Sequence, residues 1–126
     1  TTLTVNDGQA TPVAVAFTPE AVSPALSIFT DRSSGTALGF RRISVSSKFA
    51  SGKSVVNRGR LAIEYPVVYT VNGVSTLAYT LRATVDVVLP DASTVTERNN
   101  LYAFIANSLA NTAMIRPALR DLDPIY

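Results

Sequence analysis

The segment LAYTLRATVDVVL, residues 77–89, constrains the fold more than any other part of the sequence. Every odd position in it is apolar, and the even positions from Thr80 to Asp86 are polar. A side-chain period of two residues is the period of a β-strand with one buried face and one wet face. We therefore predict a long, half-buried strand at 76–89.

Two more long strands are predicted before it, at 38–50 and 54–71. Ser51-Gly52 connects these two strands, and Asn72-Gly73 connects the second of them to the strand at 76–89. Both dipeptides are typical of tight turns between antiparallel strands. The centre of the chain is therefore predicted to be an antiparallel meander.

The N-terminal part predicts a hairpin followed by shorter pieces. Asp7-Gly8 separates LTVN from TPVAVAF, which indicates two paired strands. The next stretch contains Pro12, Pro19 and Pro24 and is therefore predicted to be edge strand and loop. The segment ALSIF, 25–29, predicts a short strand, and TDRSSGT after it predicts a loop.

The pattern changes to helical after Pro90. Thr94 stands three residues before Glu97, the spacing of a capping box, and the apolar residues after it recur at helical intervals within 93–111. A second, short helix is predicted in 112–122, interrupted by Pro117. The fold class is α+β: an N-terminal hairpin, an antiparallel meander and two C-terminal helices packed on one sheet face.

Length and composition indicate one globular domain, residues 1–126. Of the 126 residues, 47% are hydrophobic and 16% charged. No apolar run approaches the roughly 20 residues of a membrane span, and the N-terminus shows no signal sequence, so we expect a soluble protein. Met114, Ile115, Leu119 and Leu122 give the last helix much apolar surface. This apolar surface could be covered in an intimate C2 dimer or in an ordinary monomeric two-layer sandwich.

Positive charge is concentrated in one block. Residues 32–60 hold seven Lys and Arg residues and no acid, whereas the whole chain has a net charge of +2. Such a block is typical of a surface that binds a polyanion. A solvated basic face that aids solubility is the alternative.

Strand alternation places a set of polar and charged side chains on one face of the meander. Arg41 and Ser47 are exceptions that fall on the apolar side. Cations there can neutralise phosphates and hydroxyls can bond to phosphate or sugar, although many sheets simply keep one wet face. Phe40 is a candidate base-stacking ring. The predicted set is Arg42, Ser44, Ser46, Lys48, Arg58, Arg60, Glu64, Arg82, Thr84 and Asp86.

The composition excludes the commonest catalytic and metal chemistry. The chain has no His and no Cys, which removes the usual general base, thiol catalysis and zinc sites. The segment SGKS at 51–54 imitates a phosphate-binding loop but lacks the first Gly, and it joins two strands. Asp121 and Asp123 lack the oxygen cage of a cation site. We predict no enzyme activity, no cofactor and no metal.

These features together resemble the coat proteins of the small single-stranded RNA bacteriophages, the leviviruses. The resemblance depends on NRGRLAIEYP at 57–66, the loop at Asn72-Gly73, the strand ending at Pro90 and the terminal PIY. It implies a dimer with one continuous sheet and interlocked helices, and a T=3 icosahedral shell formed in the host bacterial cytoplasm. It also implies that the inner sheet face binds genomic RNA and a hairpin at the replicase start, which represses translation.

The predicted set, apart from Arg42, is also the set that the resemblance carries over as RNA contacts. The sequence departs from the family's best-known member, which has lysine at Ala62, tyrosine at Arg82, asparagine at Thr84 and glutamate at Asp86. RNA binding and packaging are therefore favoured over recognition of the same hairpin. The hairpin loop around 68–78 is expected to shape contacts at the symmetry axes. A dimeric RNA-binding regulator without shells, or a surface β-domain with an incidental basic face, remain the alternatives.

Overall fold

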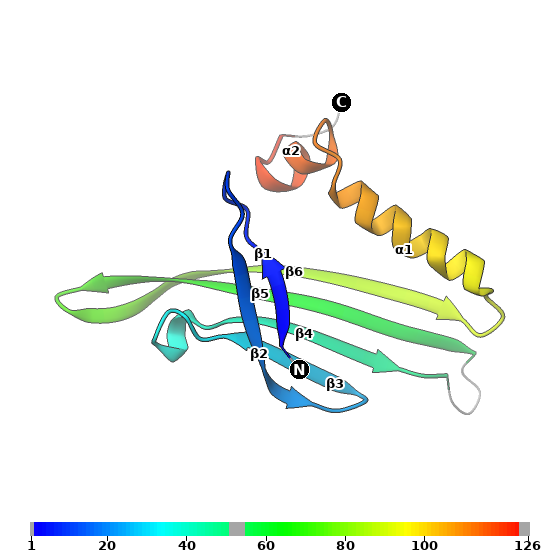
Figure 1. Cartoon of the computed structure of the whole chain (residues 1–126), viewed down its shortest axis with the longest axis horizontal. Coiled ribbons are helices and arrows are strands. Elements are labelled where there is room, and N and C mark those ends of the chain that lie inside the picture. Colours follow the sequence, from blue (N-terminus) through cyan, green and yellow to red (C-terminus); the bar gives the residue numbers. More distant parts are fainter. Residues whose placement is uncertain (1, 51–54, 124–126) are drawn as a thin grey trace. The chain divides into compact units, whose positions relative to one another are not determined.

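The computed structural model describes residues 2–50 and 55–123. The chain forms two compact units, residues Thr1–Val88 and Leu89–Tyr126. The first unit is built from strands and the second from helices (Figure 1). Among the described residues, no helix has the length and apolar character needed to cross a membrane.

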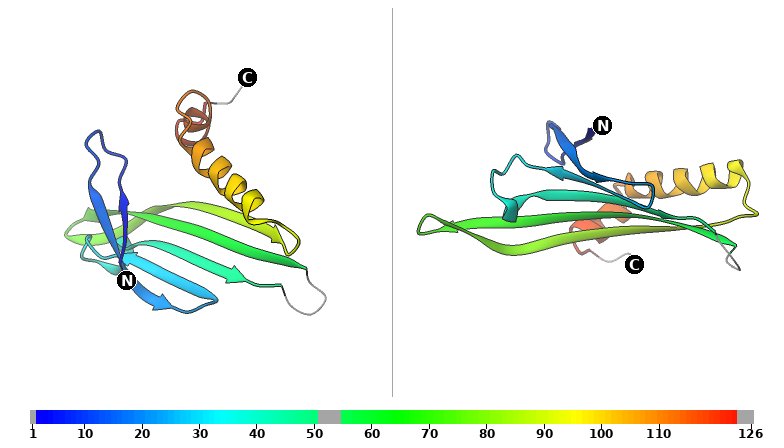
Figure 2. Two further views of the ribbon diagram at one scale, coloured as in Figure 1. Left: turned by 45° about the vertical axis from the view of Figure 1, so that its right-hand side comes forward. Right: turned by 90° about the horizontal axis from the view of Figure 1, so that it is seen from below.

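The first unit is a six-stranded sheet in which every strand is hydrogen-bonded to its sequence neighbours. The paired strands run antiparallel, as the registers of the first five strands show. The last two strands are much longer than the others, and their hairpin extends beyond the rest of the sheet (Figure 2). The strands are β1 Leu3–Asn6, β2 Ala14–Val22, β3 Leu26–Asp31, β4 Arg41–Lys48, β5 Val56–Val71 and β6 Val74–Pro90.

The turn between β5 and β6 confirms the sequence prediction. Asn72 has a φ of 52° and Gly73 a φ of 78°. Two successive positive φ values are the signature of a type I′ turn, whose twist matches that of the strands it joins. The predicted turn at Ser51-Gly52 lies outside the described residues.

The N-terminal hairpin is present, but a longer loop closes it than Asp7-Gly8 alone predicts. The Oδ1 atom of Asp7 accepts hydrogen bonds from the backbone N–H groups of Gln9 (3.2 Å) and Val13 (3.0 Å), which hold a loop between β1 and β2. Strand β2 also continues through Pro19, in the stretch that was predicted to be edge strand and loop. Pro19 pairs with Phe29, and a register shift between Pro19 and Ala21 marks a bulge directly after the proline.

Strand β4 begins later than predicted, at Arg41 instead of residue 38. A 3₁₀-helix, η1, occupies Ala37–Gly39 before it. A Cβ on Gly39 would come within 3.0 Å of Ser34 Oγ and 3.3 Å of a Val68 methyl carbon. The backbone at Gly39 thus approaches Ser34 and Val68 closely and leaves little room for a side chain at this position.

The second unit contains α1 Val95–Leu109 and α2 Ile115–Arg120. The capping box predicted for α1 is present: Thr94 Oγ1 accepts from Glu97 N (3.2 Å), and Glu97 Oε1 accepts from Thr94 N (3.0 Å). The predicted interruption of the second helix by Pro117 is wrong. Pro117 lies in the first turn of α2, where a backbone N–H has no helical acceptor to lose.

A candidate nucleic-acid interface on the sheet

The register between β4 and β5 brings most of the predicted polar residues to one face of the sheet. Directly paired residues of an antiparallel ladder project to the same side. One alternate set of pairs therefore defines this polar face, while Ile43 pairs with Ile63, and Val45 with Leu61, on the other side. The polar set is Arg42 with Glu64, Ser44 with Ala62, Ser46 with Arg60, and Lys48 with Arg58.

Ion pairs extend the polar face onto β6. Arg60 Nε donates to Asp86 Oδ1 at 2.7 Å, and Arg82 Nε lies 4.0 Å from Glu64 Oε1. Arg82 and Asp86 therefore project to the same side as the β5 residues. Thr84 lies midway between them and shares their position in the alternation. The structure thus brings all ten predicted residues to one face.

Three of the five cations on this face have a carboxylate partner. Besides the two pairs to β6, Arg42 Nε lies 3.5 Å from Glu20 Oε2, and the Thr30 hydroxyl donates to the same carboxylate oxygen. The hydrogen bond from Thr30, supported by the Arg42 charge, holds the pKa of Glu20 below its usual range. On the cationic side of a pair the effect is opposite in sign: the hydrogen bond to Asp86 raises the pKa of Arg60.

Lys48 and Arg58 differ from the other cations. They are directly paired across β4 and β5, and both side chains are exposed. Neither has an ion pair among residues 2–50 and 55–123. An open depression of about 560 Å³ adjoins them, lined also by Ser46, Arg60 and Asp86.

Comparison with known proteins identifies the family. The sequence model of the levivirus coat protein family matches residues 1–126. The chain belongs to the levivirus coat protein family. No curated protein sequence matches this coat protein.

Solved structures of several phage capsids share the coat protein's fold. The virus-like particle of bacteriophage ESE058 matches with a TM-score of 0.87 and 23% identity over 99% of this chain and 97% of that one. The virus-like particle of Beihai levi-like virus 21 gives 0.83 and 26% over 98% and 96%. The bacteriophage GA protein capsid gives 0.76 and 16% over 99% and 96%.

Family membership bears on three of the predictions. It confirms the α+β coat protein fold of sheet and C-terminal helices. It also confirms that the coat protein is structural rather than an enzyme. Its place is the capsid of the virion, as the resemblance implied.

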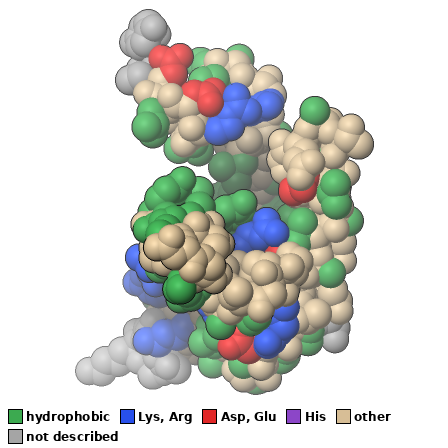
Figure 3. All heavy atoms as spheres, turned by 90° about the vertical axis from the view of Figure 1, so that its left-hand side faces the viewer, with side chains coloured by type: hydrophobic (Ala, Val, Ile, Leu, Met, Phe, Trp, Pro, Cys, Tyr) green, Lys and Arg blue, Asp and Glu red, His purple; other side chains and the backbone are tan. Residues whose placement is uncertain are grey.

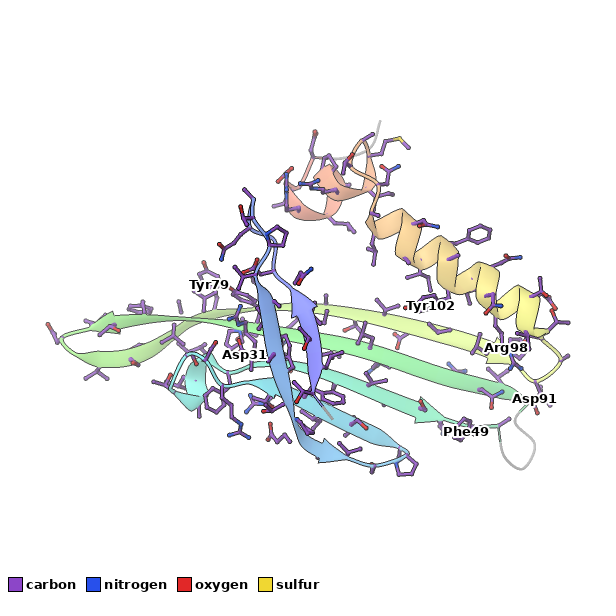
Figure 4. The ribbon with its side chains drawn as sticks, in the orientation of Figure 1. Asp31, Phe49, Tyr79, Asp91, Arg98 and Tyr102 are labelled. Atoms are coloured by element: carbon purple, nitrogen blue, oxygen red, sulfur yellow. The ribbon has the colours of Figure 1, made fainter. Side chains whose placement is uncertain are left out.

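Arg41, one of the two exceptions to the alternation, has a partner of its own on the opposite face of the coat protein's sheet. Its guanidinium Nη2 lies 2.7 Å from Asp31 Oδ2, and its Cζ lies 5.1 Å from the centre of the Tyr65 ring. Asp31, labelled in Figure 4, is buried in the sheet unit and also accepts from the backbone N–H of Ser33 at 3.0 Å. Sequence alternation missed this cluster, because only the pairing of β3 with β4 brings Asp31 opposite Arg41.

Phe40 is not the free stacking ring that the coat protein sequence suggested. Its side chain is half-buried, and the Arg32 guanidinium lies 5.3 Å from the centre of its ring. A cation–π contact therefore already uses that ring. None of the ten residues that form the polar face is aromatic.

The apolar positions of β6 are more exposed than the sequence predicted. Tyr79 is 59% exposed and Leu81 is 56% exposed, although the alternation predicted that both would be buried. Figure 3 shows hydrophobic side chains on the surface beside Lys and Arg. The described residues of the coat protein thus include apolar surface that a single chain leaves open to water.

Proposed function

We propose that this coat protein dimerises, assembles into a T=3 icosahedral shell, and binds single-stranded genomic RNA through its polar face. The observation that carries the RNA proposal is the gathering of five cations and three hydroxyls on one face of β4, β5 and β6. Cations there neutralise phosphates and release counterions, and Ser and Thr hydroxyls bond to phosphate or sugar oxygens.

The acidic members of the polar face fit the same proposal. Glu64 and Asp86 are exposed and lie beside arginines, so each pair offers both a donor and an acceptor. Exposed base edges of single-stranded RNA carry both kinds of group, and carboxylates accept from exocyclic amino groups such as that of cytosine. A face of this kind suits unpaired bases next to a phosphate backbone.

The edge of the sheet supports dimerisation. Strand β6 spans 17 residues and lies at the end of the strand order, so one side of its backbone ladder is open. A long open edge favours pairing with another strand. Two copies joined at β6 about a twofold axis form one continuous sheet, and the exposed apolar residues of both units gain cover. Both units then act as one coat protein domain.

We further propose that the polar face binds an RNA hairpin at the replicase start and represses translation. Arg82 and Thr84 occupy the middle of β6 on that face, where they can read a looped-out base. Selection of hairpins from a random RNA pool on immobilised coat protein tests this. Enrichment of one hairpin family that also lowers expression of a downstream reporter supports repression, and recovery of unrelated sequences contradicts it.

Assembly and RNA binding can be tested together on the expressed protein. Size-exclusion chromatography and electron microscopy should show uniform shells, and nuclease-protected RNA should be recovered from them. Dimers that bind RNA without ever forming shells support a free RNA-binding regulator instead. Protein that forms neither shells nor RNA complexes contradicts both functions.

A further inference from the structure

The pairing of Lys48 with Arg58 is unfavourable for the protein alone. Like charges directly opposite each other on one face of an antiparallel pair destabilise the sheet. Here the two Cα atoms are direct cross-strand partners, and both side chains are exposed. The described residues supply no carboxylate to either cation, although carboxylates reach the neighbouring arginines.

The carboxylates divide the polar face into two parts. Arg42 with Glu20, Arg60 with Asp86, and Arg82 with Glu64 each sum to zero charge. The remaining net charge of +2 belongs to Lys48 and Arg58, one unit each, at the end of β4 and the start of β5. The attraction for a polyanion is therefore strongest at one end of the face.

The surroundings of these two residues suit a phosphate group. The lysine ammonium offers three N–H donors and the guanidinium five, and neither has an acceptor among the described residues. The depression of about 560 Å³ beside them is open to solvent, and the Ser46 hydroxyl adds a further donor on the same side. A phosphate placed between the two cations replaces their mutual repulsion with two attractions.

We propose that Lys48 and Arg58 together form the backbone anchor of the RNA site, where phosphates of single-stranded RNA are held. The inference deepens the proposed RNA binding and rests on it. The anchor supplies most of the salt-sensitive, sequence-independent affinity. The three carboxylate-paired arginines contribute less to that term, because a carboxylate 2.7–4.0 Å away already offsets the charge of each.

The test compares variants of the full chain, freed of RNA, in binding a fluorescent 20-nucleotide oligouridylate at several salt concentrations. The test variant is Lys48→Gln with Arg58→Gln. The control, Arg98→Gln with Arg116→Gln, removes the same charge from the helical unit. A comparison variant on the polar face, Arg60→Gln with Asp86→Asn, removes an ion pair at constant charge.

The wild-type protein should show a steep negative slope of log affinity against log salt. Loss of two single-strand contacts should make the slope shallower by about 1.4, which corresponds to roughly 25-fold weaker binding at 0.1 M salt. The control variant should retain the wild-type slope, and the comparison variant should make the slope shallower by less than the test variant does. In urea, the Lys48→Gln, Arg58→Gln protein without RNA should be at least as stable as wild type, because the repulsion is gone.

The outcomes separate this inference from the proposed function. Failure of the wild-type protein to bind the oligouridylate contradicts RNA binding itself, whereas salt-insensitive binding overturns only the anchor. A steep wild-type slope that the Lys48→Gln, Arg58→Gln variant keeps, or that the control or the comparison variant loses equally, overturns the anchor and leaves RNA binding in place. A fall in stability of the RNA-free test variant also overturns it, since the two cations would then be structural.

Discussion

At the scale of single residues, the structure explains why a cation can stand on the apolar side of the sheet. Arg41 is held by the Asp31 carboxylate and by the face of the Tyr65 ring. Asp31 itself is buried, and a buried charge is tolerated only when it is paired and hydrogen-bonded. Burial tends to raise the pKa of Asp31, but the Ser33 hydrogen bonds and the Arg41 charge outweigh it and hold that pKa below its usual range.

We expect Asp31→Asn to destabilise the coat protein by about 1.5–3 kcal/mol at neutral pH, because Arg41 loses a charged hydrogen-bond partner. The matched control is Asp121→Asn. It removes an exposed carboxylate from a pair with the adjacent Arg120 and should change stability by less than about 0.5 kcal/mol. Urea unfolding at fixed protein concentration measures both, and equal losses would contradict a special role for Asp31.

The same pair predicts a pH dependence. The folded-state pKa of Asp31 lies below its unfolded value of about 3.9, so the stabilisation is fully present above that pH. It is lost as the pH falls further, through the folded-state pKa. The difference in unfolding free energy between wild type and Asp31→Asn should therefore shrink in acid. A constant difference between pH 7 and pH 2.5 would refute the assignment.

At the scale of elements, the β5–β6 hairpin depends on its two-residue turn. Gly73 has a φ of 78°, and a Cβ built there has no atom within 4 Å. Gly8 also has open space around it, but its φ is not positive. The two glycines therefore differ in backbone conformation and not in crowding.

We expect Gly73→Ala to destabilise the protein by about 1–2 kcal/mol, because the left-handed conformation is less favourable by that amount for a residue with a Cβ. Gly8→Ala should leave the unfolding free energy nearly unchanged. Urea midpoints of the two variants, measured side by side, decide the matter. If both variants lose the same stability, the type I′ turn is not what the hairpin requires.

Local periodicity accounts for what the sequence predicted at this scale. Alternation in β4 and β5 put Arg42, Lys48 and Arg58 on one face, and the observed register agrees. The capping box at Thr94 was equally local, since its two partners are three residues apart. Contacts between distant segments were beyond such reasoning. Two such contacts depend on how the strands pair. They are the cation–π contact of Arg32 with Phe40 and the ion pair of Glu20 with Arg42.

At the scale of the whole molecule, the exposed apolar surface and the open strand edge both favour association with a second copy of the chain. The helical unit has no buried residue among those described, and β6 is an open edge of 17 residues. Helix α1 carries an apolar stripe at helical spacing, Leu101, Phe104, Ile105 and Leu109. The sequence revealed that stripe, but a stripe alone does not reveal whether its cover comes from the same chain or from another copy.

We expect Phe104→Ala to separate these cases. Phe104 is 68% exposed in the single chain, and truncation of a side chain so exposed changes a monomer by no more than about 0.5 kcal/mol. If a second copy buries the ring, the loss should reach about 3 kcal/mol per subunit, as for a core phenylalanine. Stability should then also rise with protein concentration. Asn99→Ala, at an exposed polar position of α1, is the control and should be nearly neutral. A neutral Phe104→Ala with concentration-independent unfolding would contradict the dimer.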